Sequence, residues 1–175
     1  AALKYIPAEL TAVSAVVVMP RIPVPRDKNV QDFMNAIARM ESNNIHDTVN
    51  SYGMLGKYQF SPITLKQLGF DVTQEEFLAN ETLQDSAMIM LMQYNYKRLS
   101  EVIRIYDRTP MTYEGVEIED YSITAAGILA GAHLVGVGGV LTYFYPDKYN
   151  FPTEDANGVT VEDYMHRFAN YQVRL

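Results

Sequence analysis

The stretch from Ile37 to Phe60, which decides how the chain is interpreted, reads IARMESNNIHDTVNSYGMLGKYQF. It places one acid, Glu41, at the end of a helical pattern, before a polar loop and a segment punctuated by Gly53 and Gly56. Apolar side chains recur at three- and four-residue spacing, which is one face of a helix: Val30, Phe33, Met34, Ile37 and Met40. A lone carboxylate on a firm helix, facing a cleft floored by glycines, suits general acid chemistry on a glycosidic bond.

The loop after Glu41 contains the residue types from which sugar-binding sites are built. Glycines permit a backbone that turns sharply or comes close to a ligand. Aromatic faces suit pyranose rings, and amides suit hydroxyl and N-acetyl groups. The candidate substrate-binding residues are therefore Ser51, Tyr52, Gly53, Gly56, Tyr58, Gln59 and Phe60. A single Glu at a helix end is more often a solvated surface charge, and it is this loop that favours a catalytic role for Glu41.

Composition excludes several classes of function. The 175 residues carry a net charge of -7, which argues against a nucleic-acid-binding protein. The chain has no cysteine, and its three histidines lack the spacing of a metal site, so we expect no metal and no cofactor. No apolar run is long enough for a bilayer, so we expect no transmembrane segment.

The length and apolar fraction predict one folded domain, at 29–175. Residues 1–28 differ in composition, with prolines at 7, 20, 23 and 25, and are interpreted as an arm packed on the domain or as a linker.

The domain is predicted to be all-α, with a small β-hairpin beside the cleft. Helices are expected at 29–41, 62–68, 73–78, 80–103, 122–134 and 160–171. Glycines at 136, 138 and 139 predict a tight turn into a short helix that ends near Tyr145. Glu114-Gly115 predicts the hairpin turn, and Gln84 and Asp85 are expected to cap the long helix at 80–103.

The small residues at 122–134 would let another helix approach closely. The glycines after His133 would bring the backbone near the helix of Glu41.

The ordered motifs resemble the catalytic core of lytic transglycosylases and goose-type lysozymes. In that superfamily the catalytic Glu is followed by Ser, then by a Ser-x-x-Gly-like segment, Gly-Leu-Met-Gln and a Pro. This chain has Glu41-Ser42, Ser51-Tyr52-Gly53, Gly56-Lys57-Tyr58-Gln59 and Pro62. Lys57-Tyr58 replaces the usual Leu-Met pair, a variant similar to a phage- and secretion-associated subgroup. That subgroup also shares the segment 131–140, GAHLVGVGGV, and the ending with Asp155-Ala156-Asn157-Gly158.

The resemblance implies a lysozyme-like domain that cleaves the glycan strand of peptidoglycan. Glu41 would be the catalytic acid, and His133 and Tyr164 would line the cleft without supplying the essential proton. The implied location is extracytoplasmic, in the periplasm or on a virion that acts on the cell wall. The implied context is a larger virion, secretion or conjugation assembly.

The number of carboxylates decides the mechanism. An inverting hydrolase needs a second carboxylate to activate water, and the only acid between Glu41 and Asp71 is Asp47. This favours a one-acid lytic transglycosylase that forms 1,6-anhydro-N-acetylmuramic acid ends. Two alternatives stay open. One is a hydrolytic muramidase that uses Asp47 or another acid. The other is a weakly active or inactive glycan-binding component of a virion or envelope-crossing machine.

Overall fold

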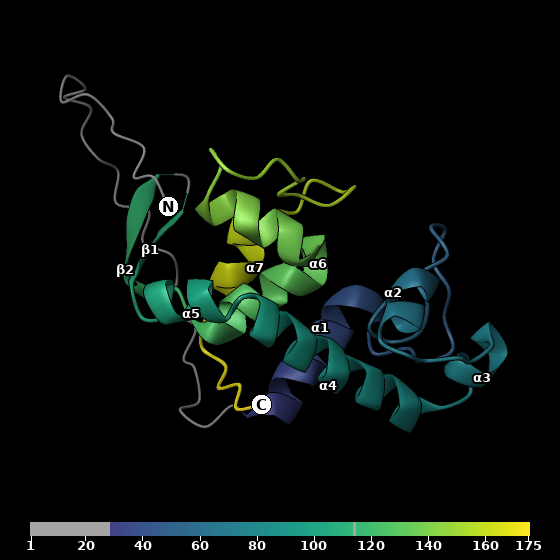
Figure 1. The fold of residues 1–175 in the computed structure, drawn as a ribbon. Coiled ribbons are helices and arrows are strands. Elements are labelled where there is room, and N and C mark those ends of the chain that lie inside the picture. The colour runs from purple at the N-terminus through teal and green to yellow at the C-terminus, as the bar shows by residue number, and fades with distance from the viewer. Residues whose placement is uncertain (1–28, 114) are drawn as a thin grey trace, which may run out of the picture.

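The computed structural model describes residues 29–113 and 115–175, so the proposed arm or linker at 1–28 lies outside the described residues. The described chain is rich in helices and has one small antiparallel sheet, as the sequence predicts (Figure 1). The helices are α1 (Val30–Ser42), α2 (Pro62–Gln67), α3 (Gln74–Leu78), α4 (Glu81–Arg98), α5 (Ser100–Tyr106), α6 (Ala125–Phe144) and α7 (Val161–Phe168). The strands are β1 (Pro110–Tyr113) and β2 (Val116–Ser122).

Side-chain caps fix where the helices begin. Asn29 and Asp32 form a capping box at the start of α1, and Thr73 and Glu76 form another at the start of α3. Ser61 caps α2, with proline at its first position. These starts confirm the sequence predictions because a cap depends only on residues that are close in the chain.

The predicted long helix at 80–103 is wrong in one respect, because the chain leaves helical geometry at Leu99. Leu99 has φ -104° and ψ 11°, and its side chain is fully buried. The bend places Val102 and Ile103 of α5 in the same apolar cluster as Leu99. The sequence does not reveal it, since no glycine or proline lies in this stretch to mark a break.

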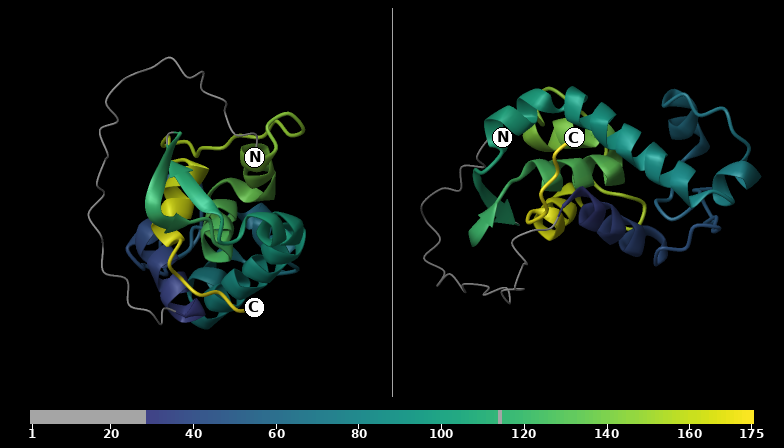
Figure 2. Two further views of the ribbon diagram at one scale, coloured as in Figure 1. Left: turned by 90° about the vertical axis from the view of Figure 1, so that its left-hand side faces the viewer. Right: turned by 90° about the horizontal axis from the view of Figure 1, so that it is seen from below.

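The hairpin forms where predicted, with Gly115 at a φ of +81° in its turn. Helix α7 lies between this hairpin and α1 in each view (Figures 1 and 2). Tyr121 of β2 stacks on His166 of α7 at 4.5 Å between ring centroids. The hairpin is thus linked to the Glu41 helix through α7.

Helix α6 is divided at Gly136, whose φ of 75° and ψ of 173° are not helical. This confirms the predicted glycine turn and the short helix that follows it to Phe144. The length and composition of α6 are those of a helix that could span a membrane. The sequence alone did not identify this segment as a candidate. Half of its apolar stretch is buried inside the fold, and a core helix has the same composition.

The glycines of α6 allow close packing on α7. A Cβ at Gly127 would lie 2.7 Å from the carbonyl oxygen of Met165, and one at Gly131 would lie 3.2 Å from Val161. This confirms that the small-residue helix accepts a close neighbour. The resulting α6–α7 pair holds Tyr164 and His133 in fixed positions near the end of α1.

Candidate functional site

Glu41 is the penultimate residue of α1 and keeps 20% of its side chain exposed. The Tyr164 hydroxyl of α7 donates a 2.8 Å hydrogen bond to Glu41 Oε1. Nε2 of His133, from α6, lies 3.8 Å from the same oxygen. The structure therefore brings together three of the residues that the sequence singled out, from three different helices.

The Tyr164 hydroxyl is held in its protonated form. Burial raises the pKa of Tyr164 far above its usual value, and the negative charge of Glu41 raises it further. Tyr164 is thus a permanent donor to Oε1. Oε2 of Glu41 accepts no hydrogen bond from the described residues.

His133 is nearly buried and is held neutral. Burial lowers the pKa of its imidazole, opposed by the Glu41 carboxylate and the Tyr58 backbone. Its Nδ1 is buried and meets the distance and angle criteria for a hydrogen bond with none of the described residues. The Phe60 ring packs edge-on against the imidazole, with 6.3 Å between the ring centroids. A neutral imidazole beside Glu41 adds no fixed charge to the site.

Ser42 ties the end of α1 to the glycine loop. Its hydroxyl donates a 2.9 Å hydrogen bond to the carbonyl of Lys57 and accepts one from the N–H of Ile45 at 3.1 Å. Asn43 ends the helix in the left-handed conformation, with φ of 55°. Glu41 is therefore held against the loop by its immediate neighbour in the sequence.

The loop itself is a tight antiparallel turn. Leu55 bridges to Val49 on one side and to Phe60 on the other. Gln59 has a φ of 54°, and its amide donates a 2.9 Å hydrogen bond to the carbonyl of Gly56. The half-buried Gln59 amide thus stabilises the turn, and no hydrogen bond joins it to Glu41.

Two proposed sugar-stacking residues need correction. Tyr58 and Phe60 are only 1% and 2% exposed, and both rings belong to the apolar core. Their faces are therefore not available to a sugar ring. Aromatic residue type alone did not distinguish a core ring from a ligand-stacking ring.

Ser51, Tyr52 and Gly53 form an exposed turn apart from this core. The Asn50 side chain accepts hydrogen bonds from the N–H groups of Tyr52 and Met54 at 2.8 and 3.0 Å. Tyr52 is 66% exposed, so its ring is open to a large ligand. No interaction links this turn to Glu41 within the described part of the chain.

The expectation that Gln84 and Asp85 cap α4 is wrong, because Asn80 is the cap. Gln84 is fully buried and accepts a 2.8 Å hydrogen bond from the Lys57 N–H, while its amide nitrogen donates to the carbonyls of His46 and Phe77. Asp85 accepts a 2.5 Å hydrogen bond from the Tyr58 hydroxyl and pairs with Lys57 Nζ at 2.9 Å.

These contacts join the glycine loop to α4. Lys57 is only 8% exposed at its side chain and also lies 3.4 Å from Glu81. The partners are separated by 24 to 28 residues, and no local pattern pointed to them.

The glycines that follow His133 do not approach α1, which corrects that expectation. A Cβ at Gly138 would lie 2.8 Å from the Phe151 ring, and one at Gly139 would lie 2.5 Å from the carbonyl oxygen of Pro152. These glycines instead accept the loop before α7.

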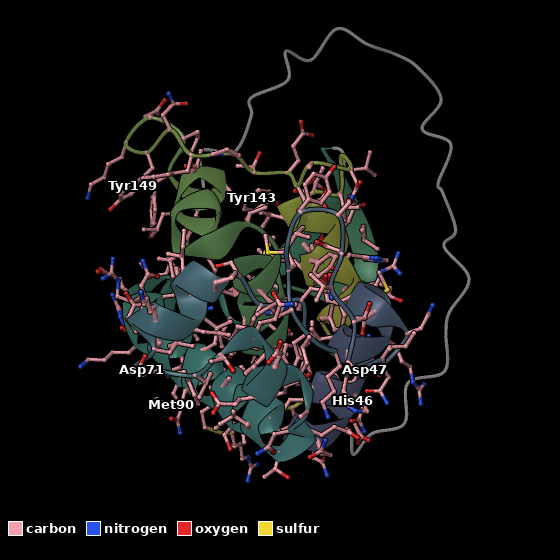
Figure 3. The ribbon with its side chains drawn as sticks, turned by 90° about the vertical axis from the view of Figure 1, so that its right-hand side faces the viewer. His46, Asp47, Asp71, Met90, Tyr143 and Tyr149 are labelled. Atoms are coloured by element: carbon pink, nitrogen blue, oxygen red, sulfur yellow. The ribbon has the colours of Figure 1, made fainter. Side chains whose placement is uncertain are left out.

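Two acids that follow Glu41 in the sequence, Asp47 and Asp71, make no polar contact with it in the described part of the chain. Asp47 is exposed beside His46 on the side of the molecule where α1 lies, whereas Asp71 lies on the other side (Figure 3). Neither makes an ion pair or hydrogen bond with Glu41 among the described residues. Among the side chains that the structure describes, no group of three histidine or acidic residues is placed to hold a metal.

Comparisons with protein-family models, curated proteins and solved structures found no match. The geometry around Glu41 and the sequence motifs are therefore the basis for inferring a function.

Proposed function

We propose that this chain is a lysozyme-like enzyme that cleaves the β-1,4 bond between N-acetylmuramic acid and N-acetylglucosamine in peptidoglycan, as a lytic transglycosylase. The observation that carries the proposal is the environment of Glu41. This partly exposed carboxyl group lies at the end of a helix, and one of its oxygens is fixed by Tyr164 and faced by a neutral His133. The Glu-Ser and glycine-loop motifs that resemble the transglycosylases converge on the same point through Ser42.

The proposed reaction uses one carboxyl group twice. Protonated Glu41 gives its proton from Oε2 to the glycosidic oxygen, and the bond to C1 of N-acetylmuramic acid breaks. The acetamido carbonyl of that sugar attacks C1 and holds the positive charge. Glu41, now a carboxylate, takes the proton of the C6 hydroxyl as that oxygen attacks C1, which releases the acetamido group and gives the 1,6-anhydro product.

Among the described residues no hydrogen bond or ion pair joins Glu41 to a second carboxylate, which favours this scheme over an inverting hydrolase. In an inverting enzyme a second carboxylate lies about 6.5 to 9.5 Å from the acid and activates water. Tyr164 and His133, which interact with Glu41, are not acids, and Asp155 acts on Tyr164 only through its charge. The hydrolytic muramidase is kept as an outcome of the experiment below.

The test is mass spectrometry of fragments released from purified peptidoglycan by the wild type and by Glu41→Gln. The variant keeps the shape of the side chain and removes the proton donor, and general acid–base groups contribute about 100- to 10,000-fold in rate. Glu75→Gln changes an exposed acid on α3 and serves as the matched control, expected to keep full activity.

Anhydro ends that disappear in Glu41→Gln would support the proposal. Reducing ends would assign a hydrolytic muramidase instead. No release by the wild type would overturn an enzymatic role and favour a glycan-binding structural component. Unchanged activity of Glu41→Gln would overturn the assignment of Glu41.

A further inference from the structure

A groove with a volume of about 400 Å³ runs along the second part of α6 and is separate from the Glu41 carboxyl group. Leu134, Val137 and Leu141 of α6 form its apolar floor, and Tyr149 and Phe151 form a wall. Arg98 and Glu154 also line it. Its size falls within the range of small-ligand sites, about 300 to 1,000 Å³.

We propose that this groove binds the stem peptide of peptidoglycan, the short acidic peptide attached to N-acetylmuramic acid. The proposal rests on the proposed function, because it names a second part of the same substrate. It assigns a role to the glycines after His133, which the chemistry at Glu41 does not use.

The wall of the groove is built in place before any ligand binds. The Phe151 ring lies directly on Gly138, and the Pro152 carbonyl lies against Gly139, where any side chain would collide. The hydroxyl of Thr142 accepts a 2.8 Å hydrogen bond from the Phe151 N–H and donates one to the Gly138 carbonyl. The segment before α7 is thus fastened to α6 (Figure 3, where Tyr149 lies beside this helix).

The charges of the groove match the chemistry of a stem peptide. Such a peptide carries carboxylates, an ammonium group where its third residue is a diamino acid, and the methyl groups of its alanines. Arg98 has no carboxylate partner among the described residues and rests against Tyr94, 5.8 Å from the ring centroid. Its guanidinium can bind a peptide carboxylate through paired hydrogen bonds, while Glu154 suits the ammonium group and the apolar floor suits the methyl groups.

The position of the groove fits a substrate that reaches both sites. Leu134 lines the groove, and the preceding residue, His133, lies against Glu41. Successive residues of a helix point about 100° apart, so the groove and the Glu41 site lie on adjacent faces of α6. A neutral glycan would use none of the charge at Arg98 and Glu154.

The direct test measures binding of the free tetrapeptide L-Ala-γ-D-Glu-meso-diaminopimelate-D-Ala to the whole chain by isothermal titration calorimetry. Arg98→Glu should weaken binding by about tenfold or more, because it replaces an attraction to carboxylates with a repulsion. Arg104→Glu makes the same charge change at an exposed position of α5 and should leave the affinity unchanged. Equal affinities for wild type and Arg98→Glu, or no binding by the wild type, would overturn the proposal.

A second measurement separates this proposal from the proposed function. Glycan strands are cut with their peptides present and after the peptides have been removed by an amidase. We expect the wild type to show a lower KM for peptide-bearing strands, and Arg98→Glu to lose that preference. If both kinds of strand are cut with the same KM, and the cutting depends on Glu41, the groove assignment is overturned and the enzyme assignment stays intact. Tetrapeptide binding lost in Arg98→Glu, with neither strand cut, would support the groove and overturn the enzyme assignment.

Discussion

The hydroxyl of Tyr164 donates a 2.8 Å hydrogen bond to Oε1 of Glu41 across 123 residues of sequence. This bond orients the Glu41 carboxyl group where α1 meets α7 and His133 of α6. It also makes the two oxygens of Glu41 different, because Oε1 accepts this bond and Oε2 accepts none from the described residues. In the proposed function we therefore expect Tyr164 to act as a positioning residue, and this can be tested apart from the chemistry of Glu41.

Tyr164→Phe should lower the rate of fragment release by about ten- to a hundredfold. A hydrogen bond to a charged group contributes about 1.5 to 3 kcal/mol, and each 1.36 kcal/mol changes a rate tenfold. Folding should change little, because Glu41 remains in contact with water. The measurements are the initial rate of fragment release from peptidoglycan and the melting temperature.

Tyr143→Phe is the matched control for Tyr164→Phe. The Tyr143 hydroxyl donates a 2.9 Å hydrogen bond to Glu162, so the control removes the same kind of tyrosine–carboxylate bond without touching Glu41. We expect it to keep wild-type activity. An equal loss of activity in both variants would mean that the effect of Tyr164 is only structural.

Gly56→Ala should destabilise the fold by about 2 to 4 kcal/mol. The new Cβ would collide with Oε1 of Gln84, at a φ of +72°. Gln84 cannot move away cheaply, since it is buried and hydrogen-bonded to the loop. Urea unfolding followed by circular dichroism gives the free energy of unfolding.

Gly53→Ala separates backbone strain from the collision. Gly53 has a similar φ of +76°, but nothing lies within 4 Å of its added Cβ. Only the cost of the left-handed conformation should remain, about 1 to 2 kcal/mol. Equal losses in the two variants would show that Gln84 does not constrain Gly56.

The parts of the fold that depend on neighbours in sequence could be predicted. Capping at Asn29, Ser61 and Thr73, the hairpin at Gly115 and the break at Gly136 all follow from local residue chemistry. The bend at Leu99 could not be predicted, because it depends on which side chains pack in the apolar cluster that contains Leu99, Val102 and Ile103.

Within the site, the motif placed Glu41 correctly at a helix end but did not separate core from surface in its loop. Tyr58 and Phe60 are buried, whereas Tyr52 in the same loop is exposed. The difference depends on α4, where Asp85 accepts a hydrogen bond from the Tyr58 hydroxyl. A contact across 27 residues leaves no local pattern in the sequence.

Lys57→Met tests how strongly α4 holds the loop. The change introduces an apolar side chain of similar length and removes the cation that pairs with Asp85 at 2.9 Å and Glu81 at 3.4 Å. Breaking a fully buried pair costs about 3 to 5 kcal/mol. Asp85 and Glu81 are partly exposed, so we expect about 1 to 3 kcal/mol after screening by solvent.

The control for Lys57→Met is Lys97→Met, at an exposed position of α4. It should change the free energy of unfolding by less than about 0.5 kcal/mol. Both values come from urea unfolding at neutral pH. A Lys57→Met variant as stable as Lys97→Met would show that the ion pairs contribute nothing to the loop, and that the Gln84 hydrogen bonds hold it alone.

His133→Gln should reduce the loss of stability on acidification. Burial lowers the pKa of His133 in the folded chain below its ordinary value of 6.5. Below that pH the unfolded chain binds a proton that the folded chain does not, so stability falls as pH drops from 6.5 through the folded pKa.

His133 contributes at most about 1.4 kcal/mol per pH unit to the slope of unfolding free energy against pH, which is the value for one proton. The glutamine variant lacks this contribution. Urea unfolding of both proteins between pH 7.5 and 5 measures the two slopes. The other titratable groups, including His166, are common to both proteins, so the difference belongs to His133. Parallel slopes would show that the pKa of His133 is the same in the folded and unfolded chains, so that the Glu41 charge cancels the effect of burial.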